Sequence, residues 1–139
     1  MIVKNDLTEL DKIFKGLEKI SMEFGFPSEI YNNLCLCIDE VFTNIVRYAY
    51  DDGREHEIEI IFDYSSRKKT FTVTISDDGK PFNPLEAQAP DFSSDLMERE
   101  IGGLGIFIVL NIMCSIEYKR LESMNKLKMT KNVNGDSSK

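Results

Sequence analysis

Apolar residues recur at helical spacing in two long stretches near the start of the chain. In residues 7–24 they fall three or four positions apart, and Gly25 and Pro27 end the pattern. A second stretch, residues 28–50, starts at Ser28, which is a suitable N-cap residue. The pattern therefore predicts two amphipathic helices that follow each other directly.

Strict alternation of apolar and polar residues replaces this pattern in the middle of the chain. Residues 57–64 and 69–77 both alternate, and the polar residues 65–68 connect them, which predicts a β-hairpin. Residues 78–101 lack either periodicity and hold three of the four prolines. A connection of this length inside a compact domain is typical of a lid or a binding loop.

The last third of the chain returns to regular patterns. Residues 102–113 predict a strongly apolar helix, and residues 115–121 and 126–130 predict two closing strands. Helices at both ends of a run of strands indicate an α+β two-layer sandwich, with helices packed on one face of a mainly antiparallel sheet. We expect a single domain over residues 1–133 and a disordered tail over residues 134–139.

Composition narrows the classes of function. The formal net charge of −7 over 139 residues argues against direct binding of nucleic acid or an anionic membrane, although one pocket could still hold a nucleotide. A single histidine, His56, excludes the usual zinc sites and most catalytic triads. The apolar run 104–114 is too short to span a membrane. No secretory signal opens the chain, and three cysteines fit reduced thiols, so we expect a cytoplasmic protein.

A polar stripe runs along the second predicted helix. Glu40, Asn44 and Arg47 are spaced three or four residues apart and therefore share one face. This face adjoins an apolar stripe that we expect to enter the core: Leu34, Ile38, Val41, Ile45 and Tyr48. The polar residues thus lie at the border of the buried face, where they either bind a ligand or form a solvated surface.

Asp77 follows the alternation of its strand onto the apolar face. It falls on the same side as Phe71, Val73 and Ile75, where a carboxylate needs a hydrogen-bond donor. Gly79 lets the chain turn tightly next to it. The alternative is a plain turn in which Asp77 accepts a bond from its own backbone.

Glycines precede the last predicted helix. The sequence Gly-Gly-Leu-Gly at residues 102–105 could bring the backbone and the helix N-terminus close to a phosphate. No Lys-Ser or Lys-Thr follows, so this is not a Walker motif. A glycine-rich hinge explains the same residues equally well.

The order of these three segments resembles a known family. The matching stretches are DEVFTNIVRYAY (39–50), SDDGKPFNP (76–84) and GGLGIFIV (102–109). They resemble the bacterial anti-sigma-factor serine/threonine protein kinases, which share the Bergerat ATP-binding fold of the histidine-kinase-like ATPase superfamily. The resemblance covers nearly the whole domain.

The resemblance implies a role for each matching residue. Glu40 would be the general base, Asn44 would hold a Mg²⁺ ion, and Asp77 would accept a hydrogen bond from the adenine amine. The other residues implied to contact ATP are Arg47, Gly79, Gly102, Gly103, Leu104, Gly105 and Ile106. Asn125 stands where the family usually has a threonine near the adenine, and we expect it to replace that contact.

The family also implies a substrate and partners. The chain would phosphorylate a serine on a small antagonist protein of the STAS type, and it could also sequester a sigma factor. Homodimers are common in the family. Two alternatives remain: a nucleotide-gated binding module without kinase activity, and a detached ATPase domain of a histidine kinase.

Overall fold

The computed structural model describes residues 1–83 and 102–134, and for residues 102–104 and 106 it describes the backbone alone. Its elements are β1 (Ile2–Lys4), η1 (Leu7–Glu9), α1 (Leu10–Phe24), α2 (Ser28–Tyr48), β2 (Glu57–Ser65), β3 (Thr70–Asp77), α4 (Gly102–Ile112), β4 (Ser115–Leu121) and β5 (Met124–Asn132). The expected lid and tail lie outside the described residues, except for 78–83 and Asn134.

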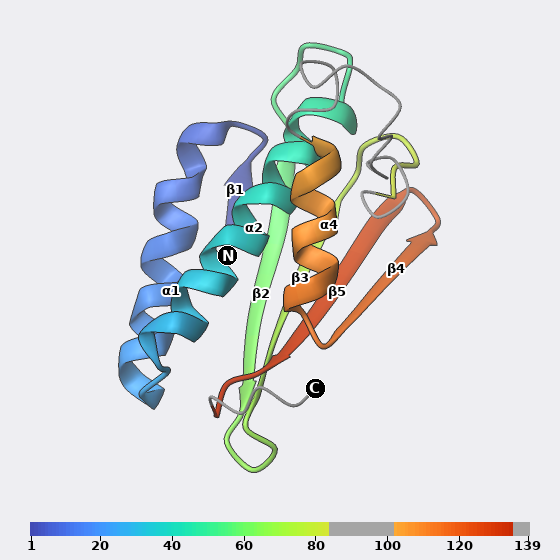
Figure 1. The fold of residues 1–139 in the computed structure, drawn as a ribbon. Coiled ribbons are helices and arrows are strands. Elements are labelled where there is room, and N and C mark those ends of the chain that lie inside the picture. Colours follow the sequence, from blue (N-terminus) through green and yellow to red (C-terminus); the bar gives the residue numbers. More distant parts are fainter. Residues whose placement is uncertain (84–101, 135–139) are drawn as a thin grey trace.

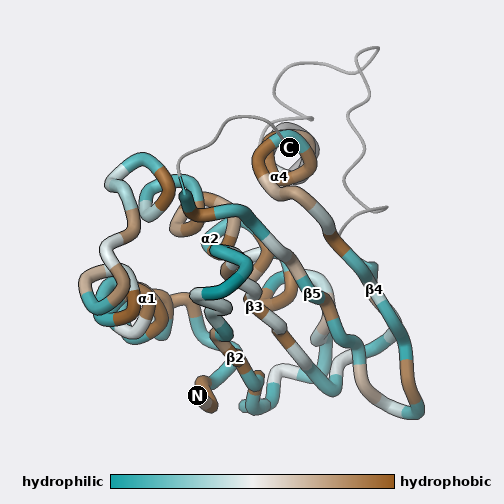
Figure 2. The backbone as a smooth tube through the Cα atoms, turned by 90° about the horizontal axis from the view of Figure 1, so that it is seen from below, coloured by the Kyte–Doolittle hydropathy of each residue, from teal (hydrophilic) through white to brown (hydrophobic). Residues whose placement is uncertain are grey.

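The strands form one antiparallel sheet in the order β1-β2-β3-β5-β4. All three helices lie on the same face of this sheet, with α2 between α1 and α4 (Figure 1). Figure 2, turned by 90°, shows the helices on one side of the row of strands. The predicted α+β two-layer sandwich is confirmed.

The core fills the space between the helices and the sheet. Alternate residues of β2, β3 and β5 point toward the helices, as the period-2 pattern predicted. The most deeply buried large side chains include Leu17, Leu34, Ile38, Phe42, Ile60, Phe71, Ile75 and Met129. Because α2 supplies much of this core, its remaining face is held rigidly toward α4.

Several boundaries differ from the sequence prediction. Pro27, not Ser28, is the N-cap of α2, because the Pro27 carbonyl accepts the Tyr31 N–H at 3.0 Å. The three-residue strand β1 was not predicted, since so short a stretch shows no periodicity. Tyr48 was expected in the core but is 40% exposed. It lies in the last turn of α2 and its ring contacts only the edge of the next turn, at Phe82.

Within the described residues, no helix combines the length and the apolar character needed to cross a membrane.

Candidate functional site

Asn44 is the most unusual polar residue of α2. It is 1% exposed, so it is buried rather than at the border where the sequence placed it. Neither its Oδ1 nor its Nδ2 has a hydrogen-bond partner among the described residues. Leaving a buried polar group unpaired costs about 1–3 kcal/mol. Both atoms are therefore available to a ligand that would offset this cost.

Glu40 lies one helical turn before Asn44 and is half-buried. Burial is the largest cause that raises the pKa of the Glu40 carboxyl above its ordinary value of 4.5. The nearby Asp39 charge raises this pKa further, and the exposed Arg47 lowers it. A carboxylate with a raised pKa is a better proton acceptor, as a general base requires.

Gly105 in α4 lies directly against the Glu40 carboxyl group. A Cβ atom placed on Gly105 would overlap the Cδ and both carboxylate oxygens of Glu40. Only glycine therefore lets α4 approach α2 this closely without moving Glu40. This contact brings two of the three predicted motifs together.

Gly105→Ala is expected to destabilise the protein, although alanine normally stabilises a helix by about 1 kcal/mol relative to glycine. The new methyl group must displace either Glu40 or α4. Thermal unfolding measures the effect, and Gly16→Ala in α1 is the matched control, because the added Cβ would meet the flexible end of Met1. A melting temperature that rises in both variants would contradict this packing.

Asp77 ends β3 on the buried face, as its alternation predicted, and is 2% exposed. Its Oδ1 accepts the Gly79 N–H and the Asn125 Nδ2, each at 2.9 Å. Both interpretations from the sequence are thus correct, since Asp77 points inward and also caps its own turn. Burial raises the pKa of Asp77, while the hydrogen bonds from Asn125 and Gly79 lower it. Among the described residues, no donor reaches Oδ2.

Asn125 is 3% exposed and holds Asp77 in place through a network of hydrogen bonds. Its Oδ1 accepts the Tyr118 hydroxyl at 2.5 Å and Nη1 of Arg120 at 3.1 Å. The sequence analysis missed Tyr118 and Arg120. The signal that could have found them is the alternation of β4, which places both on the same inward face as Asp77.

The turn after Asp77 packs on the C-terminal end of α2. Lys80 N–H donates to the Ala49 carbonyl at 2.9 Å, and a Cβ atom on Gly79 would overlap that same carbonyl oxygen. Arg120 Nη1 also donates to the Gly79 carbonyl, at 2.8 Å. Gly79 is therefore required for close approach, and α2 links the Asp77 cluster to Asn44.

The structure brings the predicted residues into two adjoining groups. The first is Glu40, Asn44 and Gly105, and the second is Asp77, Gly79 and Asn125. Arg47 lies on the same helix but is exposed. Gly102, Gly103, Leu104 and Ile106 belong to α4, which begins at Gly102, and their side chains lie outside the described residues.

Comparison with known families gives this arrangement a context. The model of the histidine kinase-like ATPase domain matches residues 3–131, which is most of the chain. The chain belongs to this family. The match includes both groups of site residues and every strand except the ends of β1 and β5.

Relatives within this ATPase family carry the names of serine kinases. The chain is 27% identical over 114 residues to the serine/threonine-protein kinase BtrW of Bordetella bronchiseptica, covering 82% of this chain and 79% of that protein. It is 29% identical over 124 residues to the serine-protein kinase RsbW of Listeria monocytogenes, covering 86% and 76%. The resemblance to the anti-sigma-factor kinases within the ATPase superfamily is thereby confirmed.

A solved histidine kinase has the same fold. The blue-light activated histidine kinase of Erythrobacter litoralis EL346 superposes with a TM-score of 0.60 at 16% identity, over 82% of this chain. The match spans about a third of that protein, 34% of its length. At this identity the likeness concerns the ATPase fold alone.

Proposed function

We propose that the chain binds ATP with Mg²⁺ and transfers the γ-phosphate to a serine of a small STAS-like antagonist protein. The observation that carries this proposal is Asn44, whose two amide atoms are buried and unpaired one turn from a carboxylate with a raised pKa. A generic α+β domain has no reason to retain both. The names of the relatives support transfer to serine.

Adenine would bind at the Asp77 end of the site. Asp77 Oδ1 is occupied by Gly79 and Asn125, which fixes the orientation of the carboxylate and directs Oδ2 to the ligand. A carboxylate oxygen accepts a hydrogen bond and therefore selects the exocyclic amine of adenine. Asn125 would act on the base through Asp77, in place of the family threonine.

The phosphates and the metal would bind at the other end of the site. The unpaired Oδ1 of Asn44 is an oxygen ligand of the kind that Mg²⁺ prefers. When bound, Mg²⁺ neutralises phosphate charge and helps to align the reacting groups. The glycine-rich start of α4 would approach the phosphates, and Arg47 would add positive charge.

Glu40 would then accept the proton of the serine hydroxyl. The serine oxygen forms a bond to the γ-phosphorus, and the bond from that phosphorus to the β–γ bridging oxygen breaks, so that ADP leaves. The proton moves to the Glu40 carboxylate. Close contact with Gly105 holds this carboxylate in place, and positioning is most of what the protein must supply.

The partners follow from the family. Besides phosphorylating the antagonist, the chain would bind a sigma factor in the cytoplasm, without contacting nucleic acid or a membrane itself. A nucleotide-gated binding module is the second candidate, in which the same ATP site only selects the partner.

The test combines binding and transfer. Calorimetry with a non-hydrolysable ATP analogue is expected to show binding that Mg²⁺ strengthens roughly tenfold or more, and Asn44→Ala is expected to remove this gain. Labelled γ-phosphate is then followed to a STAS-like protein encoded near this chain, with its acceptor serine replaced by alanine as the control. Absence of nucleotide binding would refute the proposal, and binding without transfer would favour the binding module.

A further inference from the structure

The sheet has a second face that none of the described helices covers (Figure 2). It consists of the outward-pointing residues of all five strands, most of which are exposed on β1, β2, β4 and β5. On the central strand β3 these outward positions are Thr70, Thr72, Thr74 and Ser76. The middle of this face is therefore a strip of small, uncharged hydroxyl side chains.

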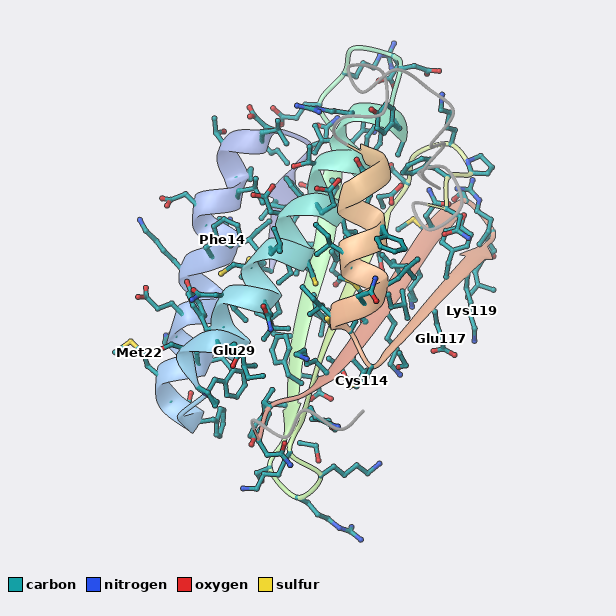
Figure 3. The ribbon with its side chains drawn as sticks, viewed as in Figure 1. Phe14, Met22, Glu29, Cys114, Glu117 and Lys119 are labelled. Carbon is teal, nitrogen blue, oxygen red and sulfur yellow. The ribbon has the colours of Figure 1, made fainter. Side chains whose placement is uncertain are left out.

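Charges on this open face separate into two halves on either side of β3. The β2 half is acidic, with Glu57, Glu59 and Asp63 exposed and Ile61 between them. The other half is basic, with Lys126 and Lys128 on β5 and Lys119 on β4. Glu117, opposite Lys128, offsets one of these lysines. Figure 3 shows Glu117 and Lys119 on β4, far from α1 and α2.

The strand register keeps these opposite charges apart within one chain. Glu59 pairs with Ser76, Ser76 with Lys126, and Lys126 with Lys119, so the acidic and basic residues are two strands apart. Lys119 and Lys126 lie directly opposite each other, which is unfavourable. Among the described residues, none of the charged side chains of the two halves forms an ion pair.

Two-fold symmetry would bring the opposite charges together. Rotation by 180° about an axis in the plane of the face and along β3 places the β2 half of one chain on the β5–β4 half of a second copy. Residues of one row then stay at the same level, so Glu59 of each chain faces Lys126 of the other. We propose that the open sheet face is the interface of a homodimer, in which two sheets pack face to face with the helices outside.

A second copy fits this face better than another kind of partner. An acidic or basic ligand would match one half and be repelled by the other, whereas the same surface rotated matches both. Small side chains on β3 allow the sheets to approach, and Ile2 and Ile61, each 47% exposed, add apolar area to bury. A two-fold axis across the strands is excluded because it would place Glu59 near acidic residues.

Charge reversal tests the pairing directly. Sedimentation velocity is expected to show a wild-type dimer that weakens as salt increases. Glu59→Lys and Lys126→Glu each create two like-charge contacts, so each variant alone is expected to raise the dimer Kd by roughly tenfold or more. An equimolar mixture of the two variants is expected to form heterodimers, and the double variant is expected to regain the homodimer.

The control is Lys15→Glu in α1, which changes the net charge as much as Lys126→Glu does but lies on the helical side. It is expected to leave the dimer Kd unchanged, and circular dichroism verifies that every variant is folded. A monomeric wild type would overturn the proposal. So would a dimer that is indifferent to both single variants, or a mixture that forms no heterodimer.

Discussion

Glu40→Gln is expected to slow phosphate transfer to serine by a factor of roughly 10² to 10⁴ while leaving affinity for Mg²⁺ and ATP nearly unchanged. Glutamine keeps the shape of the side chain against Gly105, so the packing of α4 on α2 is preserved. It cannot accept the serine proton. Single-turnover transfer measures the rate and calorimetry measures the binding.

Asp39→Asn is the matched control for Glu40→Gln. It removes one negative charge from the neighbouring position, where Asp39 is exposed and accepts the Thr43 hydroxyl at 3.1 Å. Its transfer rate is expected to stay within a few-fold of the wild type. Equal losses in the two variants would show that the effect is general electrostatics, and a normal rate in Glu40→Gln would show that Glu40 is not the base.

The pH dependence of transfer gives an independent check on Glu40. A base must be ionised, so the wild-type rate is expected to fall as the pH drops through the raised pKa of Glu40. Glu40→Gln is expected to lose this acidic limb. Asp39→Asn is expected to move the limb to lower pH, because the Asp39 charge is one cause that raises the pKa.

Periodic patterns predicted most of the fold. Long stretches such as α2 and β3 bury a full stripe or alternate face, and their types and approximate ends were correct. The start of β5 was predicted two residues late, because Asn125 is polar but points inward, contrary to the pattern. Its burial depends on Tyr118 and Arg120 from the neighbouring strand, which a local pattern does not reveal.

The candidate site was predictable in its members but not in its contacts. Spacing along α2 placed Glu40 and Asn44 on one face, and alternation placed Asp77 inward. The approach of Gly105 to Glu40 depends on how α4 packs across α2, which spacing along one chain segment does not determine. Burial of Asn44, against an expected border position, likewise reflects that packing.

Asp77→Asn is expected to change which purine nucleotide binds. In the wild type, Oδ1 accepts two hydrogen bonds from Gly79 and Asn125, so asparagine is expected to keep its oxygen there. Its NH₂ group then takes the place of Oδ2 and faces the adenine amine, donor against donor. Affinity for ATP is expected to fall by about a hundredfold or more.

Inosine triphosphate (ITP) distinguishes this effect from a general loss of binding. ITP carries a carbonyl acceptor where ATP carries the amine, so the carboxylate of Asp77 repels it and the amide of Asp77→Asn pairs with it. The ATP preference of the wild type is therefore expected to be lost or reversed, as competitive calorimetry with the two nucleotides would measure. Asp78→Asn, at an exposed side chain that accepts the Tyr50 hydroxyl, is the matched control.

Stability separates recognition from folding in the same variant. Because burial raises the pKa of Asp77, its contribution to stability is largest below the unfolded pKa of 3.8 and is lost as the pH rises through the folded pKa. Asparagine has no charge to bury, so Asp77→Asn is expected to melt no lower than the wild type at neutral pH. Unchanged ATP affinity in this stably folded variant would rule out Asp77 as the adenine acceptor. A gain for ITP would identify it, because only a group facing the base can exchange one purine for another.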